Sequence, residues 1–306
     1  MYNETSLSGI IGGAITPFEA DFEVDWDSFE SHLHQLAEGG LSALLINASM
    51  AEGSHLSAKE RELTLSFAIE QVGSLVPVFA TVYGHNTKAA QDEARLAEAL
   101  GAQALLIYPH AAFGGEELDP DLPVRYFSAI AEVTSVPLIV FRTPSSLAPT
   151  FDFDVLSRLA QIDGVAAVKD STGEVDFYRN EGAVFVAPGS PLKVLADHDP
   201  TLPEFLKLGV HGATVMSAVV DTEKWVELFN TGDGSETNAR HKRLAEFARH
   251  VYDRPFRDFR ARLKEALRLD GVIKNSTVRP PLTELTDHDR QAVAEALARS
   301  REAVDA

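Results

Sequence analysis

The segment from residue 164 to residue 174 reads Gly-Val-Ala-Ala-Val-Lys-Asp-Ser-Thr-Gly-Glu. Its first half is an uninterrupted run of small and β-branched residues, which predicts a short strand buried on both faces. Lys169 stands at the carboxyl end of that strand, where its side chain would be partly desolvated. Desolvation disfavours the charged form of a lysine, and a neutral amine can form a Schiff base with a carbonyl substrate. The segment alone leaves equally open that Lys169 only ends the strand and reaches solvent or pairs with Asp170.

Similar apolar runs alternate with helical patterns along the rest of the chain. No two strands are joined by a two-residue hairpin turn, so the pattern predicts a mostly parallel sheet with helical crossovers. The other predicted strands are 10–18, 42–47, 76–83, 104–108, 137–141 and 212–219, and the seventh strand is either 184–187 or 192–196. The helices predicted between them are 25–38, 57–72, 87–100, 121–133, 151–161 and 200–208.

Eight strand–helix units of about 29 residues each favour a closed (β/α)8 TIM barrel. The alternative, an open doubly wound sheet of the dinucleotide-binding type, lacks its glycine fingerprint because Gly9, Gly12 and Gly13 have the wrong spacing. The helical sequence after the last strand is longer than one barrel unit. We therefore assign residues 1–222 to the barrel and residues 223–306 to a C-terminal helical extension packed on the barrel.

The composition limits the classes of protein to which the chain can belong. Its 306 residues, 45% of them hydrophobic, can bury a large core. No apolar run is long enough to cross a membrane, and residues 1–8 lack the layout of a signal peptide, so the cytoplasm is the simplest compartment. A net charge of −19 repels phosphate backbones, and nucleic acid is therefore not an expected partner.

The sequence carries no pattern that predicts a metal or another cofactor. Cysteine is absent, which excludes thiolate ligands, a thiolate nucleophile and disulfides. The ten histidines form no His-x-Glu-x-x-His pair, and neither a Gly-x-Ser-x-Gly elbow nor a Walker-type loop occurs. Asp197-His198-Asp199 could supply ligands, but such a run is more typical of a solvated loop.

In a barrel of this kind the functional site lies at the carboxyl ends of the strands. Lys169 is the obvious nucleophile among the predicted strand-end residues. Arg142 could hold a substrate carboxylate, and His110 could move protons near neutral pH, although either could equally be a loop residue in solvent. Glu52 is expected to bond backbone amides of its own turn rather than act as a base. The strand-end residues are Thr16, Asn47 to Met50, Tyr83, Tyr108 to His110, Phe141 to Thr143, Lys169 and Val215 to Ser217.

Several segments together resemble the dihydrodipicolinate synthase and N-acetylneuraminate lyase family, which are class I barrel enzymes that form Schiff bases. The match runs almost end to end, and its most specific part is Val168 to Gly173, which is similar to the lysine motif of the family. Ala48 to Glu52 stands where the family has Gly-Thr-Thr-Gly-Glu. The other similar segments are Gly13 to Phe18, Leu56 with Glu60-Arg61, Leu208 to Ala213 and Val278 to Leu282.

The resemblance implies a small 2-keto acid as substrate and an imine on Lys169. It also implies that backbone amides near Ser49 and Met50 hold the substrate carboxylate, that Val215 at the end of the last strand contributes to substrate binding, and that the chain forms a homotetramer or dimer. No metal or cofactor is implied.

The chain departs from the family at several of these positions. Phe141 replaces the tyrosine that shuttles the proton when the imine is made and broken, and phenylalanine has no exchangeable proton. His110-Ala111 replace a tyrosine pair, Ser146 replaces an arginine, and Ser49 and Met50 replace two threonines. Alanine replaces glycine at residues 48 and 51, so this loop has less freedom at positive φ.

The leading hypothesis is a Schiff-base-forming lyase that acts on a small 2-keto acid through Lys169, by aldol cleavage or dehydration, and is not a true dihydrodipicolinate synthase. His110, Ser49 or a water held by Arg142 are the candidates for proton transfer in place of tyrosine. Arg142 beside the Phe141 ring would suit a second carboxylate on the substrate. The alternative is a catalytically reduced barrel that binds a keto acid or another small carboxylate.

Overall fold

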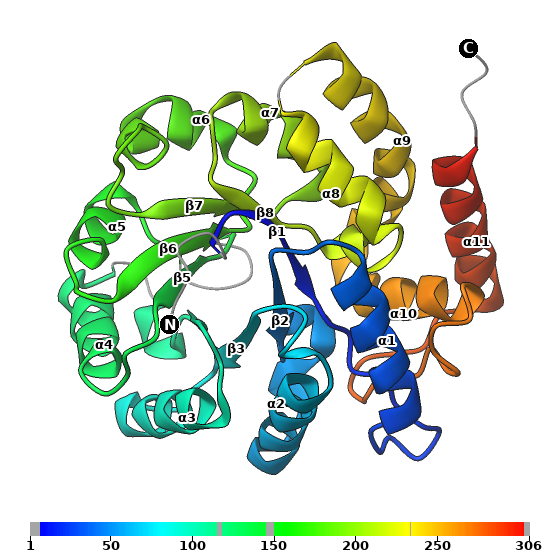
Figure 1. Cartoon of the computed structure of the whole chain (residues 1–306), viewed down its shortest axis with the longest axis horizontal. Helices are drawn as coiled ribbons and strands as arrows, with labels where there is room; N and C mark the ends of the chain where they lie inside the picture. The colour runs from blue at the N-terminus through cyan, green and yellow to red at the C-terminus, as the bar shows by residue number, and fades with distance from the viewer. Residues whose placement is uncertain (1–6, 115–117, 145–149, 233, 303–306) are drawn as a thin grey trace.

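The computed structural model describes residues 7–114, 118–144, 150–232 and 234–302, so Ser146 lies outside the described residues. Eight parallel strands pair in chain order, and the first also pairs with the last, so the sheet closes into a barrel (Figure 1). This confirms the predicted TIM barrel. The strands are β1 Gly9–Gly13, β2 Ala43–Ile46, β3 Val78–Val82, β4 Leu105–Ile107, β5 Leu138–Arg142, β6 Val165–Asp170, β7 Lys193–Ala196 and β8 Gly212–Thr214.

Helices follow the strands and form the outer layer of the barrel. Asp25 caps the first by accepting the Ser28 amide hydrogen, and Ser57 and Glu60 form a capping box at the start of the second. Gly101 ends the third helix in the left-handed conformation. These helices are α1 Trp26–Glu38, α2 Ala58–Val72, α3 Thr87–Leu100, α4 Asp121–Ala131, α5 Phe153–Leu159, α6 Val175–Arg179, α7 Leu202–Lys207 and α8 Thr222–Thr231.

The structure settles which segment forms the seventh strand. β7 covers residues 193–196, whereas residues 181–185 form the short 3-10 helix η5. β7 pairs with β6 on one side and β8 on the other. The loop after β7 therefore opens at the barrel mouth beside the carboxyl end of β6, which carries Lys169.

Three further helices lie beyond the ring on one side of the barrel: α9 Ser235–Tyr252, α10 Phe259–Leu269 and α11 Asp287–Arg301 (Figure 1). α9 and α10 are separate helices because Pro255, a residue that cannot continue a helix, lies between them. α8 packs on β1 as the eighth helix of the ring, although we assigned residues 223–231 to the extension. The two-part division of the chain remains a prediction.

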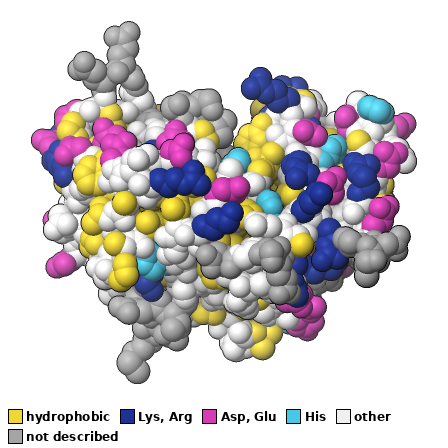
Figure 2. Space-filling model, turned by 90° about the horizontal axis from the view of Figure 1, so that it is seen from above, with side chains coloured by type: hydrophobic (Ala, Val, Ile, Leu, Met, Phe, Trp, Pro, Cys, Tyr) yellow, Lys and Arg dark blue, Asp and Glu magenta, His cyan; other side chains and the backbone are white. Residues whose placement is uncertain are grey.

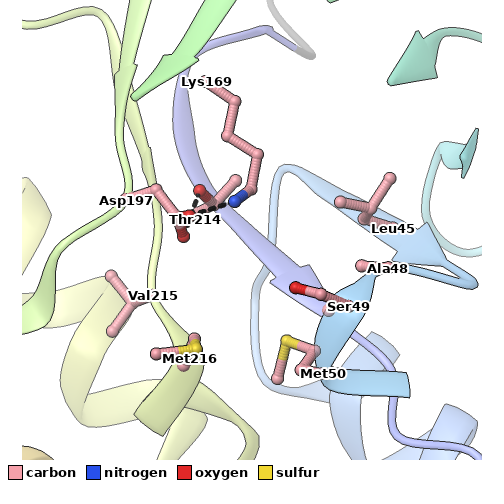
Figure 3. A pocket seen from close by; sticks show the side chains of 10 residues that line it. Leu45, Ala48, Ser49, Met50, Lys169, Asp197, Thr214, Val215 and Met216 are labelled. Atoms are coloured by element: carbon pink, nitrogen blue, oxygen red, sulfur yellow. Dashed lines mark hydrogen bonds and ion pairs between the residues drawn. The ribbon is translucent and has the colours of Figure 1, made fainter. Parts of the chain in front are cut away.

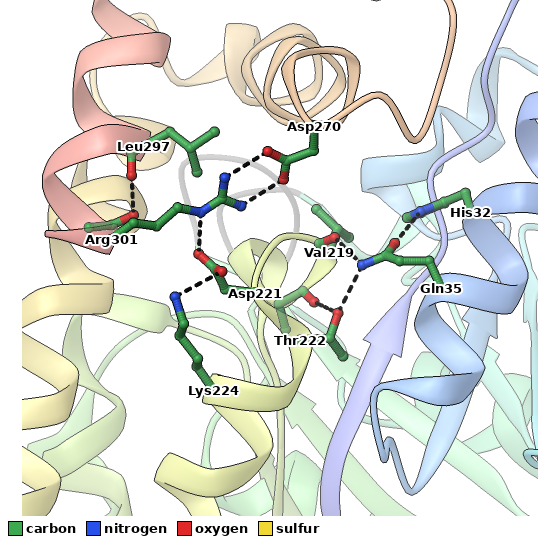
Figure 4. Close-up of polar contacts among 11 residues, drawn as sticks. His32, Gln35, Val219, Asp221, Thr222, Lys224, Asp270, Leu297 and Arg301 are labelled. Carbon is green, nitrogen blue, oxygen red and sulfur yellow. Dashed lines mark hydrogen bonds and ion pairs between the residues drawn. The ribbon is translucent and has the colours of Figure 1, made fainter. Parts of the chain in front are cut away.

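Polar contacts near the surface join the extension to the barrel. Both terminal guanidinium nitrogens of Arg301 in α11 lie 2.7 Å from the Asp270 carboxylate, and Arg301 Nε lies 3.0 Å from Asp221, just before α8 (Figure 4). In α1, Gln35 donates to the Val219 carbonyl at 3.2 Å and accepts from the ring of His32. The first and last parts of the chain are therefore held at one edge of the barrel.

The apolar core has two layers, as the alternation of side chains along a strand requires. One layer lies between strands and ring helices and includes Val140 and Val168. The other fills the barrel interior and continues into α10 and α11, and it includes Ile139, Phe141 and Ala167. Lys169 follows Val168 and pairs in register with Phe141, so both point into the barrel interior. No helix among the described residues is long and apolar enough to cross a membrane.

The outer surface of the barrel carries charged side chains of both signs beside hydrophobic ones (Figure 2). Figure 2 shows Lys and Arg side chains interspersed with Asp and Glu on the face drawn there. On that face the acidic side chains are thus not gathered in a single patch.

Candidate active site

A pocket lies at the carboxyl ends of β1, β2, β6 and β8 (Figure 3). Lys169 and Asp197 stand on one side of it, and Ser49 and Met50 stand opposite. Met50, Val215 and Met216 make much of the wall apolar. The lining residues are Gly13, Leu45, Ala48, Ser49, Met50, Lys169, Asp197, Thr214, Val215 and Met216.

Lys169 lies in the mouth of the barrel with 7% of its surface exposed. Its Nζ forms an ion pair with Asp197 and lies 3.4 Å from the Ser171 hydroxyl oxygen. The same Nζ lies 4.2 Å from the centre of the Phe141 ring, within the range of a cation–π contact. The alternative that Lys169 pairs with Asp170 does not hold, because Asp170 is the next residue along β6 and faces the helices.

Asp197 is the lysine's partner, and it comes directly after β7. Its backbone amide donates to the Asp170 carbonyl at 2.7 Å, which extends the pairing of β6 and β7 by one residue. Thr214 in β8 donates its hydroxyl to Oδ1 at 2.8 Å, and Ser171 donates its hydroxyl to Oδ2. The ends of β6 and β8 therefore direct polar hydrogens at one buried carboxylate, which follows β7.

Asp199, two residues further on, is completely buried and holds the loop after β8. It accepts the amide hydrogens of Met216 at 3.1 Å and Ser217 at 2.9 Å. Burial raises the pKa of Asp199, against the effect of these hydrogen bonds. The expectation of a solvated loop is therefore wrong at residues 197 and 199. The described residues contain no group of three or more acidic or histidine side chains arranged to hold a metal.

Phe141 belongs to a row of three aromatic rings. The Tyr108 ring lies edge-on to Phe141 with centroids 5.0 Å apart, and the Tyr83 ring lies 4.5 Å beyond Tyr108. Tyr83 donates its hydroxyl to the Asn47 carbonyl at 2.9 Å, and the side chains of Ser49 and Tyr83 interact with the Tyr108 hydroxyl. Burial raises the pKa of both tyrosines, so their hydroxyls stay protonated at neutral pH.

Ser49 and Met50 begin the short 3-10 helix η2 Ser49–Ala51 after β2. The backbone amides at the start of a helix have no partner within it. The amides of Ser49 and Met50 donate to no residue that the structure describes. Met50 reaches across to β1, where a side chain at Gly13 would collide with its sulfur atom. Both side chains line the pocket.

Comparison with known proteins assigns the family. The model of the dihydrodipicolinate synthetase family matches residues 6–300. The chain belongs to the dihydrodipicolinate synthetase family. A 4-hydroxy-tetrahydrodipicolinate synthase from Bacillus velezensis is 26% identical over 293 residues, which are 94% of this chain and 98% of the relative. An uncharacterized DapA-like lyase from Halobacterium salinarum is 28% identical over 95% of this chain and 93% of the relative. The chain is accordingly a lyase of this family.

Solved structures agree with the fold. The pyruvate complex of the dihydrodipicolinate synthase from Acinetobacter baumannii superposes with a TM-score of 0.86 at 24% identity, covering 96% of this chain and 99% of that one. The dihydrodipicolinate synthase from Agrobacterium tumefaciens gives a TM-score of 0.87 at 21% identity, covering 97% and 99%. The family barrel is therefore preserved across nearly the whole chain.

Arg142 does not lie in the family's pocket in this member. It follows Phe141 on β5, so it points to the opposite face of the sheet, and it is 3% exposed. Its Nη1 lies 2.9 Å from Asp170, its Nη2 lies 2.8 Å from Glu174, and its Nε donates to the Phe151 carbonyl at 2.7 Å. Burial alone would lower the pKa of Arg142, but the negative charge of Asp170 outweighs it and raises that pKa above its usual value. The guanidinium is thus engaged outside the barrel and is not available to a substrate beside Lys169.

His110 is also separate from Lys169. Its Nδ1 accepts the Ala112 amide hydrogen at 3.0 Å, so Nε2 carries the proton and donates to the His85 carbonyl at 2.9 Å. Its ring faces Phe113 and Tyr126. The structure does not bring His110 together with the residues that line the pocket. The predicted catalytic role of His110 is therefore left without geometric support.

Sequence reasoning missed the residues that hold η2 in place. Glu52 is fully buried and does not cap its own turn. It pairs with Lys264 in α10 at 2.6 Å and accepts the Arg279 amide hydrogen at 2.9 Å. Burial lowers the pKa of Lys264 to about 8, although Glu52 opposes this change. Arg260, one turn earlier in α10, donates Nε to the Ser49 carbonyl at 2.6 Å. The extension thus fixes the loop whose amides face the pocket.

Proposed function

We propose that this chain is a Schiff-base-forming lyase, of the aldolase or dehydratase type, that acts on a small 2-keto acid through Lys169. The observation that carries the proposal is the position of Lys169 Nζ, which is buried in the barrel mouth and lines the pocket. An amine is the nucleophile that converts a ketone into an iminium ion, and Lys169 is the one lysine among the residues that line this pocket.

The start of η2 supports a 2-keto acid rather than a simple ketone. Ser49 and Met50 lie across the pocket from Lys169, and their backbone amides, which donate to no residue that the structure describes, carry the partial positive charge of a helix start. A carboxylate held there would place the neighbouring carbonyl carbon between η2 and Nζ. Val215, Met50 and Met216 leave an apolar wall for a short carbon chain.

The second candidate function is a barrel that binds a keto acid or another small carboxylate without turning it over. Phe141 favours this candidate, because the ring over Nζ has no hydroxyl where the family has its tyrosine. The two functions differ in one measurable respect, since only the lyase forms a covalent imine.

Reductive trapping separates them. The full-length protein is incubated with pyruvate, and then with other 2-keto acids, in the presence of cyanoborohydride, and digested for mass mapping. We expect an adduct on the peptide that carries Lys169 and none on the peptide with Lys264, the other buried lysine. Lys169→Ala should abolish the adduct. A folded protein that gives no adduct with a broad keto-acid panel would establish the binding function instead.

The remaining expectations concern assembly and compartment. We propose a homotetramer or dimer, on the basis of the family resemblance, and a cytoplasmic location, on the basis of a chain with no cysteine. Light scattering coupled to size-exclusion chromatography measures the assembled mass. A mass equal to the 33.2 kDa chain would exclude the oligomer.

A further inference from the structure

We propose that Asp197 is the catalytic residue that carries protons between Lys169 and the substrate oxygen, in the place of the missing tyrosine. The inference rests on the proposed function and adds to it the group that moves the protons. Among the residues that line the pocket, Asp197 is the only one with a carboxylate. That carboxylate is in contact with the nucleophile itself, through the ion pair with Nζ.

The surroundings of Asp197 suit a group that accepts and returns protons. The hydroxyls of Thr214 and Ser171 each donate to one of its oxygens, so the carboxylate is fixed in orientation. Its exposed fraction is only 7%, so bulk water does not compete freely for the same protons. The two hydroxyls can also pass a proton onward, because a hydroxyl both donates and accepts.

The alternatives are held elsewhere. Phe141 has no proton to give, and its ring covers one side of Nζ. Glu52 is committed to Lys264, and both ring nitrogens of His110 are committed to backbone groups. The Tyr108 ring packs edge-on against Phe141, and its hydroxyl interacts with the side chains of Ser49 and Tyr83.

The proton balance of imine formation matches one reusable carboxylate. Asp197 takes a proton from the Lys169 ammonium, and the freed lone pair attacks C2 of the keto acid while the C2–oxygen π bond breaks. Asp197 returns that proton to the oxygen, which gives the carbinolamine. A second proton then passes from nitrogen through Asp197 to the hydroxyl, which leaves as water while the C2–nitrogen double bond forms. Two protons leave nitrogen, both end in the water, and Asp197 ends as a carboxylate.

The test compares rates of imine formation in full-length variants, with pyruvate as the probe and cyanoborohydride in excess. Asp197→Asn keeps the size of the side chain but removes the proton acceptor, and we expect trapping about 10²–10⁴-fold slower than wild type. Asp197→Ala should be equally slow, and added formate should accelerate it in proportion to its concentration by supplying a mobile carboxylate. Glu174→Gln is the matched control, since it removes an ion-paired carboxylate on the outer face of the barrel, and it should trap at the wild-type rate.

The outcomes are distinct. If the wild type forms the adduct and Asp197→Asn forms it at the same rate, the role of Asp197 is overturned and the Schiff base stands. An absence of adduct from the wild type would overturn both. If Asp197→Asn does not fold, as judged by circular dichroism, the formate dependence of Asp197→Ala decides, and a rate that ignores formate would refute the shuttle.

Discussion

Phe141 and Arg142 are neighbours on β5 yet belong to opposite sides of the barrel wall. The Phe141 ring lies 4.2 Å from Lys169 Nζ, whereas Arg142 Nη1 lies 2.9 Å from Asp170 and its guanidinium stacks 4.3 Å from the Phe177 ring. This arrangement argues against a substrate with a second carboxylate, because the guanidinium that would bind it faces the helices.

Replacement of Arg142 should therefore affect stability rather than substrate choice. Arg142→Met leaves Asp170 buried without its cation, and we expect the free energy of unfolding to fall by about 3–5 kcal/mol. The ratio of trapping rates for mono- and dicarboxylic keto acids should stay at its wild-type value. Urea unfolding and the trapping assay measure the two effects. A selective loss of dicarboxylate trapping in folded protein would return Arg142 to the site.

Phe141→Tyr should change little if Asp197 moves the protons. A restored proton-transfer group would accelerate an impaired site by about 10²–10⁴-fold, whereas an added hydroxyl beside a working carboxylate has no step to accelerate. We expect less than about a tenfold change in the trapping rate, measured beside Phe141→Leu, which removes the ring from Nζ without adding a hydroxyl. A large gain in Phe141→Tyr would show that the site lacks a proton carrier.

Condensation of pyruvate with aspartate semialdehyde should be negligible. Ala111 and Ser146 stand where the family has the side chains that position the second substrate and relay its proton. Loss of one such proton-transfer group commonly lowers the rate by about 10²–10⁴-fold. A coupled assay that follows consumption of the product measures this activity. Ordinary turnover in it would contradict the prediction.

The buried pair of Glu52 and Lys264 should contribute strongly to stability when one partner alone is removed. Lys264→Met leaves the Glu52 carboxylate buried without its cation, and we expect a loss of about 3–5 kcal/mol in the free energy of unfolding. Lys59→Met is the control, because Lys59 pairs with Glu62 in solvent, and it should change stability by less than about 0.5 kcal/mol. The double variant Glu52→Gln, Lys264→Met should regain part of the lost free energy of unfolding, because it no longer buries an unpaired carboxylate. Chemical unfolding measures these free energies, and an equal loss of stability in Lys264→Met and Lys59→Met would contradict the prediction.

His32 should make stability fall as the pH falls from neutral. Its Nε2 accepts the Ile15 amide hydrogen at 3.1 Å, and burial lowers its pKa from 6.5 to about 4. Between pH 6.5 and pH 4 the unfolded chain binds a proton that the folded chain does not, so the stability that is present above pH 6.5 is lost as the pH falls toward 4. The loss from this group is about 3 kcal/mol at its full extent. His32→Gln should lose this component, which urea unfolding at pH 7 and pH 5 measures. An equal pH dependence in variant and wild type would contradict it.

The fold was predictable because strand and helix patterns alternate along the chain with turn signals between them. The ambiguity at the seventh strand was real in the sequence, since residues 184–187 and 192–196 are both short apolar runs, and only pairing with β6 and β8 separates them. The break between α9 and α10 was predictable, because Pro255 was a visible signal.

The site was predicted in part. Lys169, Ser49, Met50 and Val215 all line the pocket, and Phe141 faces the lysine. Arg142 was misplaced although the period of two along a strand already puts it opposite Phe141. Asp197 is missed because a run such as Asp197-His198-Asp199 is typical of a solvated loop, although an acidic residue directly after the next strand is a usable signal. The partnership of Glu52 with Lys264 gave no local signal, because it joins positions 212 residues apart.

That separation also sets an order of events during synthesis. The ribosome extends a chain by about 5–20 residues per second, so Glu52 is made about 10–40 s before the lysine that neutralises it. During that interval the strands of the barrel are emerging, but the loop that carries Ser49 and Met50 has neither Lys264 nor Arg260 to hold it. The mouth of the barrel is therefore completed by residues that are synthesised late, and a nascent chain that stops before α10 would carry all eight strands without the contacts that fix this loop.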